Sequence, residues 1–283
     1  MLADPGLWYI HEPFNPNKGF WPDEFSYVPS GESSPEVDTY FSGLLSGRYR
    51  GTSLYPNTDL PWMPLRLIRP PIRRVLIKDP LACLLSPYLA DRFKLRTVVL
   101  FRHPAGFVAS VLRLGWPIAK FIQQFLSNDG LMADHLSRHS ELLTKHQFGS
   151  DAPAAAVLHG SLNTVLWNLI QKRPGTDWYR FEDLCENPIA RFQQVFATLG
   201  LPYTEHTRLR HESLCFRGDS DPASYHPHSV RRLSLAMGTS WKDELTSNQV
   251  NQIRDIWEQF EIPLYQGLDD WYRVAQKPSA VNP

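Results

Sequence analysis

The chain has 283 residues, of which 29 are basic and 29 acidic, so its formal net charge is zero. Its 42% hydrophobic and 20% charged residues are typical of a globular protein with a core of its own. The balanced charge argues against a nucleic-acid binder that depends on a broad basic surface, so we expect no nucleic-acid partner.

The sequence shows no sign of a membrane-spanning segment, a signal peptide or a set of paired cysteines. No hydrophobic run approaches the length of a membrane-spanning helix, and the first five residues do not form a signal peptide. The three cysteines, Cys83, Cys185 and Cys215, are widely spaced, which favours neither a disulfide framework nor a zinc site. We therefore expect a cytoplasmic protein in a reducing compartment, without stable membrane insertion.

The first third of the chain carries two short strands and a long loop. Residues 7–10 are predicted as a strand shortly before Glu12, and residues 73–77 as a strand that ends at Lys78. Residues 15–60 are rich in proline, glycine, serine and aromatic side chains, with a helix predicted over 36–45. They form either an exposed, aromatic-lined insertion suited to substrate binding or a packed surface loop. A further helix is predicted over 81–93.

A strand, a tight turn and a helix follow in residues 98–113. The apolar run 98–101 is too short for a helix and rich in valine, so we predict a buried strand. Pro104 ends it, and the helix that follows carries Ser110 about two turns in. Arg102, at the carboxyl end of a strand and beside a helix amino terminus, is well placed to bind an anion. The alternative is an ordinary surface arginine and an ordinary helical serine.

The rest of the chain alternates helices with one more strand. Helices are predicted over 116–126, 131–146, 154–170, 189–199 and 248–260, a strand over 177–181, and a polar loop over 203–240. His135 and His139 share a helix face, but no glutamate lies between them as in a zinc-binding HExxH motif, so we expect no metal site. Strands that alternate with helices predict an α/β fold with a parallel sheet.

Four landmarks, taken in order, resemble the sulfotransferases that use 3′-phosphoadenosine 5′-phosphosulfate (PAPS), in particular bacterial and carbohydrate-type members. They are Glu12-Pro13-Phe14, Lys78-Asp79-Pro80, Arg102 with Pro104 and Ser110, and Glu182-Asp183-Leu184 with Trp241. The resemblance covers residues 4–260. It implies a single domain over residues 1–283, built on a P-loop-NTPase-like parallel sheet flanked by helices, with residues 15–60 as an insertion over the cleft.

The resemblance also implies a donor site. In the family, the residues that match Arg102 and Ser110 grip the 3′-phosphate of PAPS. Phe181 stands where a tyrosine usually contacts the adenine, and it keeps an apolar contact without the hydroxyl. The family's Arg-Lys-Gly triplet is absent at the expected distance, so Arg231 and Arg232 are the nearest substitutes to close over the 3′-phosphate.

Two residues are implied to act in catalysis. Glu12 matches the position of a proposed general base that accepts the proton of the acceptor hydroxyl. The alternative is that it pairs locally before Pro13. Lys78 would stabilise the charge that develops on the bridging oxygen, or it is a solvated lysine at a strand end. Asp79 is a weaker candidate, because families with a base near this position use a histidine there.

One part of the family pattern is missing. The strand and the glycine- and serine-rich phosphate loop that hold the 5′-phosphosulfate precede the first landmark in the family, and the sequence does not contain them. We expect a start codon assigned too far downstream or a truncated gene, and two unpaired strand edges where the missing strand would lie.

The function implied is transfer of a sulfuryl group from PAPS to a hydroxyl of a carbohydrate, glycolipid or small-molecule acceptor, with no metal required. The alternative is a non-catalytic remnant that binds a nucleotide or a partner. A P-loop kinase relative is disfavoured, because no G-x-x-x-x-G-K-[ST] motif occurs in the chain.

Overall fold

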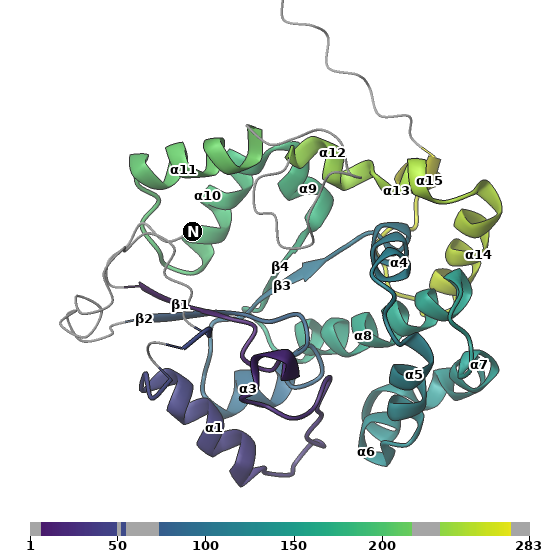
Figure 1. Ribbon diagram of the computed structural model, residues 1–283, viewed down its shortest axis with the longest axis horizontal. Coiled ribbons are helices and arrows are strands. Elements are labelled where there is room, and N and C mark those ends of the chain that lie inside the picture. Colours follow the sequence, from purple (N-terminus) through teal and green to yellow (C-terminus); the bar gives the residue numbers. More distant parts are fainter. Residues whose placement is uncertain (1–6, 50–51, 55–73, 217–232, 273–283) are drawn as a thin grey trace, which may run out of the picture.

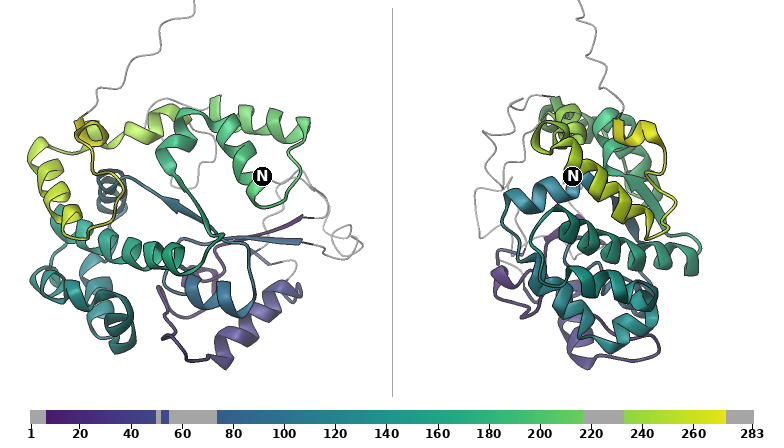
Figure 2. Two further views of the ribbon diagram at one scale, coloured as in Figure 1. Left: turned by 180° about the vertical axis from the view of Figure 1, so that it is seen from behind. Right: turned by 90° about the vertical axis from the view of Figure 1, so that its right-hand side faces the viewer.

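The strands pair in parallel, but in two separate two-stranded sheets. The computed structural model describes residues 7–49, 52–54, 74–216 and 233–272. Strand β1 (Leu7–His11) pairs with β2 (Arg74–Lys78), and β3 (Val98–Phe101) pairs with β4 (Asp177–Arg180). The two pairs come together near the middle of the molecule (Figures 1 and 2). The parallel pairing agrees with the prediction, whereas one continuous sheet does not form among the described residues.

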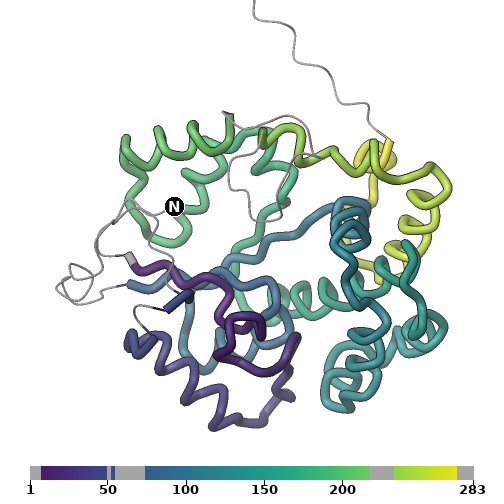
Figure 3. Tube along the Cα trace, viewed as in Figure 1, coloured from purple at the N-terminus to yellow at the C-terminus, as the bar shows by residue number. Residues whose placement is uncertain are grey.

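Helices lie on both sides of the strands, which makes the protein a mostly helical α/β structure (Figures 1 and 3). One side carries α1 (Pro35–Leu45), α3 (Ser86–Arg92) and α8 (Ala152–Lys172). The opposite side carries α9 (Phe181–Glu186), α10 (Pro188–Thr198) and α11 (Glu205–Phe216).

The remaining helices surround α8 or connect the elements. They are η1 (Pro16–Lys18), α4 (Pro104–Arg113), α5 (Ile118–Leu126), α6 (Asp129–Leu131), η2 (Met132–Leu136), η3 (Ser137–His139), α7 (Ser140–His146), α12 (Ser234–Thr239), α13 (Trp241–Glu244), α14 (Ser247–Glu258) and α15 (Leu268–Tyr272). No single helix of the described residues has the length and apolar character to cross a membrane. Only α4 and α5 taken together, which meet at a bend of 117°, pass by length and composition.

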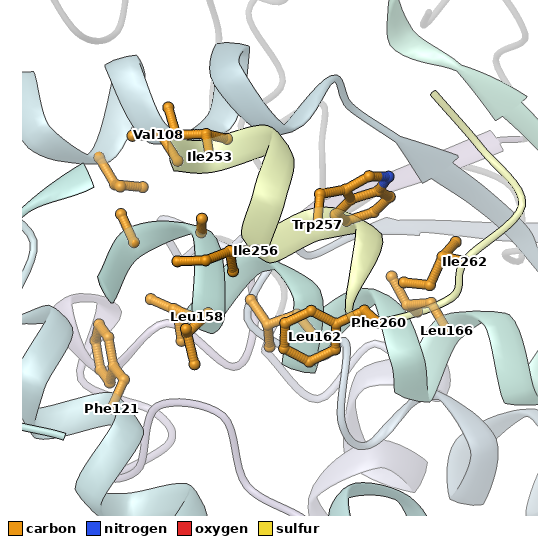
Figure 4. Packing of buried hydrophobic residues seen from close by; sticks show 14 of the residues in the cluster. Val108, Phe121, Leu158, Leu162, Leu166, Ile253, Ile256, Trp257, Phe260 and Ile262 are labelled. Atoms are coloured by element: carbon orange, nitrogen blue, oxygen red, sulfur yellow. The ribbon is translucent and has the colours of Figure 1, made fainter. Parts of the chain in front are cut away.

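Helix α8 is the centre of the larger core. Asp151 caps its first turn by accepting a hydrogen bond from the Ala154 amide, and Pro153 lies in that turn. Its buried side chains pack against α4, α5 and α14 (Figure 4). At Gly160 a Cβ atom would lie 2.2 Å from the ring of Phe260, so only glycine allows this close approach.

A second core covers the β1–β2 pair and is rich in aromatic rings. Phe14, Trp21, Tyr40 and Phe41 are buried there, with the ring of Phe14 5.3 Å from Trp21 and 5.5 Å from Tyr40. These aromatic side chains therefore belong to a packed segment, the second of the two alternatives for residues 15–60. Whether this segment also covers a cleft stays a prediction, and residues 50–51 and 55–60 lie outside the described part.

Three predicted elements need correction. The helix predicted over 81–93 begins only at Ser86, because Asp79 holds the Leu81 amide in a turn after Pro80. The helix predicted over 131–146 is broken by a π turn and a 3₁₀ turn. The π turn brings Leu131 and Leu136, five residues apart, into the core together.

The polar loop predicted over 203–240 is wrong at both of its ends, because α11 and α12 are helical. Helix α11 is polar overall, yet Thr207, His211 and Cys215 recur every four residues and are buried. Arg208 forms ion pairs with Glu205 and Glu212 on its outer side. The helix was not predicted because its composition is polar and its buried residues, spaced by four, are few. Residues 217–232 lie outside the described part.

Candidate functional site

Glu12 and Lys78 meet at the carboxyl ends of β1 and β2. The Glu12 amide donates to the Lys78 carbonyl at 2.8 Å, and Lys78 Nζ lies 2.5 Å from Glu12 Oε1. Asn15 Nδ2 donates to Oε2 at 3.1 Å. Glu12 has a φ of 50°, a left-handed conformation that is uncommon for a side chain of this size and occurs at functional sites.

The carboxyl group of Glu12 is held ionised by its partners. Burial alone would raise its pKa, but the hydrogen bonds and charge of Lys78, together with Asn15, outweigh burial and lower the pKa below its ordinary value. Glu12 is therefore able to accept a proton at neutral pH, although its ion pair with Lys78 makes it a weaker base than a free carboxylate.

Asp79 joins the two turns that follow β1 and β2. Its Oδ2 accepts from the Phe14 amide at 2.6 Å, and its Oδ1 accepts from the Leu81 amide at 2.8 Å. Burial raises the pKa of Asp79 to about 6 despite these bonds. Asp79 thus fixes the loop that carries Glu12, which is a positioning task. His11 lies beside this group, with Nδ1 2.8 Å from the Tyr9 hydroxyl and Nε2 3.8 Å from Glu12 Oε1.

Arg102 and Ser110 lie along one face of α4. A Cβ atom at Gly106 would lie 3.3 Å from Arg102 Nε, so the arginine side chain runs over Gly106. Ser110 is one helical turn further along the same face. In the part of the chain that the structure describes, the Arg102 guanidinium forms no hydrogen bond or ion pair, and the Ser110 hydroxyl forms no hydrogen bond.

The ring of Phe181 lies next to Arg102. The centre of the Arg102 guanidinium is 5.1 Å from the ring centroid, which is a cation–π contact. Phe181 therefore helps to hold Arg102, and an additional contact with adenine stays a prediction. Arg231 and Arg232 lie outside the described residues.

Two buried residues that we did not predict as site residues hold the backbone at Arg102. The Nε2 atom of His159, on α8, lies 3.0 Å from the Arg102 carbonyl oxygen, to which it donates. Tyr265 donates its hydroxyl to Glu182 Oε2 at 2.6 Å, while Glu182 Oε1 accepts from the His103 amide at 3.0 Å. Burial raises the pKa of Glu182. No local motif marks His159 or Tyr265, because each contacts this region only through the tertiary fold.

The positive charge around Arg102 comes from the arginine itself and not from the histidines near it. Burial lowers the pKa of His103 and of His159 to about 3, so both imidazoles are neutral at physiological pH. Burial also lowers the pKa of Arg102, but an arginine starts so high that it stays protonated. Arg102 is thus a charged group without a hydrogen-bond acceptor among the described residues, which is an arrangement suited to anion binding.

The structure thereby sorts the predicted residues into two groups. Glu12 and Lys78 lie together at the end of the β1–β2 sheet, and Arg102, Ser110 and Phe181 lie together at the end of the β3–β4 sheet. The first group suits proton transfer and charge stabilisation, and the second suits anion binding. Among the described residues, no group of three or more His, Cys, Asp and Glu side chains is arranged to hold a metal ion.

Comparisons with known proteins find a distant structural similarity. No protein-family model matches the chain, and no curated protein matches it. The structure is similar to the sulfotransferase domain from the curacin biosynthetic pathway, with a TM-score of 0.40 and 16% sequence identity. The alignment covers 69% of this chain and 64% of that one, so less than two thirds of the curacin domain is spanned. A similarity this distant does not assign an activity.

Proposed function

We propose that this protein is a PAPS-dependent sulfotransferase. The observation that carries the proposal is the Arg102 guanidinium, which has no hydrogen bond or ion pair among the described residues and lies at the start of α4. A charge withdrawn from water without a partner is costly. A phosphate group that binds Arg102 and the Ser110 hydroxyl, with the helix amino terminus nearby, removes that cost. The resemblance of the four ordered sequence landmarks to those of PAPS-dependent sulfotransferases supports the 3′-phosphate of PAPS as this phosphate.

In the proposed reaction, Arg102 and Ser110 fix the position of the donor. The oxygen of an acceptor hydroxyl attacks sulfur in line and forms the new sulfur–oxygen bond. The bond between sulfur and the bridging oxygen breaks, its electron pair stays on the 5′-phosphate, and Glu12 takes the hydroxyl proton. Lys78 balances the charge on the departing phosphate.

The ion pair between Lys78 and Glu12 links these two tasks. While Lys78 contacts Glu12, it lowers the pKa of the carboxyl and makes it a poor base. When Lys78 turns toward the donor, Glu12 loses its cation, its pKa rises, and it accepts a proton more readily. Donor binding would in this way prepare the base for the acceptor.

Three further assignments belong to the proposal. Phe181 contacts the adenine as well as Arg102, and Arg231 and Arg232 close over the 3′-phosphate. The acceptor is a hydroxyl of a carbohydrate or glycolipid, which the Glu12-Pro13-Phe14 phrase favours by analogy over a small phenol. The reaction requires no metal, and the domain spans the whole chain and acts in the cytoplasm.

The second candidate is a protein that binds the nucleotide without transferring a sulfuryl group. The observation in its favour is that the described strands form two separate sheets, and that the sequence contains no glycine-rich phosphate loop. Such a protein would hold the 3′ end of the donor and leave the reacting end without backbone amides around it.

The test is calorimetric titration with 3′-phosphoadenosine 5′-phosphate, for this chain and for one extended upstream of Met1. We expect Arg102→Ala to weaken binding by about 10- to 100-fold, as loss of a charge-assisted hydrogen bond does. The matched control is Arg138→Ala, which removes an exposed arginine of η3. Unchanged binding by Arg102→Ala would show that the site is assigned wrongly.

A transfer assay with radiolabelled donor separates the two candidates. A panel of hydroxyl acceptors is offered to the wild type and to Glu12→Gln. We expect the substitution to depress turnover far more than donor binding, and equal losses in both would remove Glu12 as the base. Tight nucleotide binding with no transfer by either the given or the extended chain would support the non-catalytic protein.

A further inference from the structure

Arg113 lies on the same face of α4 as the predicted anion-binding residues. Gly106, Ser110 and Arg113 are spaced by four and three residues, which places them in a row along the helix. The Arg102 side chain runs over the first of them. Arg113 therefore extends the row that begins with the Arg102 guanidinium, at a position that the sequence motif does not include.

Helix α13 closes this row from the side. The Cδ1 atom of Trp241 lies 3.5 Å from the Cβ position of Gly106, so α13 packs against α4 at the point where Arg102 crosses it. One turn further along α13, Glu244 forms an ion pair with the Arg113 guanidinium through Nη1 and Oε2. Arg102, Arg113 and Glu244 thus gather on one seam between two helices.

The charges along this seam act on one another. Burial lowers the pKa of Arg102 most, and the nearby positive charge of Arg113 lowers it further, while Glu182 and Glu244 oppose that effect. Two guanidinium groups therefore lie within electrostatic reach of each other, and among the described residues Arg113 forms its ion pair with Glu244. An additional anion at this seam would relieve the repulsion between them.

We propose that Arg113 is a second cationic ligand of the phosphate group held by Arg102 and Ser110, and that Glu244 occupies Arg113 until that phosphate binds. This inference rests on the proposed function, because it concerns the same 3′-phosphate. Glu244 acts as an internal competitor for the site, and it also keeps the Arg113 side chain in place for the exchange.

The exposure of the pair makes such an exchange feasible. The Arg113 side chain is 44% exposed and the Glu244 side chain 25% exposed, and exposed ion pairs contribute little stability. A phosphate dianion offers a guanidinium two parallel hydrogen bonds and a higher charge than a carboxylate. Arg113 therefore gains by leaving Glu244 for the phosphate, and Glu244 is released toward solvent.

The test compares two nucleotides that differ only in the 3′-phosphate. Binding of 3′-phosphoadenosine 5′-phosphate and of adenosine 5′-phosphate is measured by calorimetry for Arg113→Gln and Glu244→Gln. We expect Arg113→Gln to weaken binding of the 3′-phosphorylated nucleotide about tenfold or more and to leave the other unchanged. We expect Glu244→Gln to strengthen binding of the 3′-phosphorylated nucleotide several-fold, because the competitor is gone.

A second ion pair serves as the matched control. Lys120 on α5 and Glu24 form a pair of similar exposure, with Nζ 2.8 Å from Oε2. Lys120→Gln and Glu24→Gln are expected to change neither affinity. The melting temperature of every variant is recorded. A gain in affinity by Glu244→Gln cannot arise from loss of folded protein, so it stays decisive even if Arg113→Gln folds poorly.

The outcomes separate this inference from the proposed function. If Arg102→Ala abolishes binding while Glu244→Gln leaves it unchanged or weakens it, the Arg113–Glu244 pair only ties α4 to α13, and the inference is overturned while the function stands. If the wild type binds the two nucleotides with equal affinity and Arg102→Ala changes neither affinity, the proposed function is wrong, and the inference is wrong with it.

Discussion

Lys78 and Glu12 form an ion pair across the ends of two parallel strands, with Nζ 2.5 Å from Oε1. The partners are 66 residues apart in the sequence, and β1 and β2 bring them together by pairing His11 with Lys78. The pair joins the proposed base to the proposed charge-stabilising lysine before any substrate is bound, and its effect on Glu12 can be measured without an activity assay.

We expect Lys78→Met to raise the pKa of Glu12, because burial of the carboxyl remains while its cation is lost. The check is a carbon-13 NMR titration of the Glu12 carboxyl in the free protein. Lys145→Met, which removes an exposed lysine of α7, is the control. A pKa that does not move would mean that Asn15 and His11 keep the carboxylate ionised without Lys78.

The ion pair between Lys78 and Glu12 also makes a pH-dependent contribution to the free energy of unfolding. Because the pKa of Glu12 is lower in the folded than in the unfolded chain, its contribution is present above the ordinary carboxyl pKa and is lost as pH falls through the folded value. We expect Lys78→Met to lower the free energy of unfolding at neutral pH and to have less effect in acid. Urea titrations at two pH values measure this, and equal losses at both would contradict it.

Asp79 is expected to show the opposite pH dependence. Its pKa of about 6 lies above that of an unfolded aspartate, so its contribution is full in acid and is lost as pH rises through about 6. Asp79→Asn keeps one acceptor oxygen but turns an amide group toward a backbone N–H. We expect it to destabilise more at pH 4.5 than at pH 7.5 in urea unfolding. A loss that is larger at the higher pH would show that the ionised form is the favoured one.

Gly160→Ala is expected to destabilise the protein by about 1–3 kcal/mol through overpacking, because the new methyl group meets the ring of Phe260. Helix propensity alone would give the opposite sign, since alanine is favoured over glycine inside a helix. Chemical denaturation measures the change. The double variant Gly160→Ala with Phe260→Leu should cost less than the sum of the two single changes, and strict additivity would argue against a direct clash.

His159→Phe is expected to leave the Arg102 carbonyl without its donor. The aromatic replacement keeps the stack against Phe107, whose ring lies 4.3 Å away, so the cost comes from the lost hydrogen bond, about 1–3 kcal/mol. Nucleotide affinity should fall with it, because Arg102 loses its backbone anchor. His159→Gln, which can still donate, should recover part of both losses. Because the His159 imidazole is neutral, we expect its titration to make no contribution to nucleotide affinity near pH 6.5. The pH dependence of nucleotide affinity in this range should therefore be the same in the wild type and in His159→Phe.

Local sequence was sufficient for the strands and for the helix that carries the anion site. Residues 98–101 are too few for a helix and form the strand β3, and Pro104 starts α4. The prediction that this strand is buried holds for Val99 and Phe101 but is wrong for Leu100, which is 49% exposed. Arg102 precedes α4, and its side chain reaches Gly106, which lies one turn before Ser110 on the helix. These predictions depend on residues close together in the chain.

The aromatic residues of 14–41 show where such reasoning stopped. Their composition allowed an exposed insertion or a packed loop, and only the packing of Phe14 against Trp21 and Tyr40 distinguishes the two. Helix α11 was missed for a related reason, because two of its three buried positions are occupied by the polar residues Thr207 and His211, which a search for apolar periodicity does not count.

The partners of the site residues were decided by the tertiary structure. Arg102 and His159 are 57 residues apart, and Arg113 and Glu244 are 131 apart, and no local pattern links either pair. The division of the strands into two sheets is of the same kind, because the hydrogen-bonding edge of a strand does not depend on its own side-chain sequence. A motif can therefore place Arg102 at the end of a strand, whereas the fold decides that its guanidinium lies near Glu182 and Glu244 without a hydrogen bond or ion pair to any of the described residues.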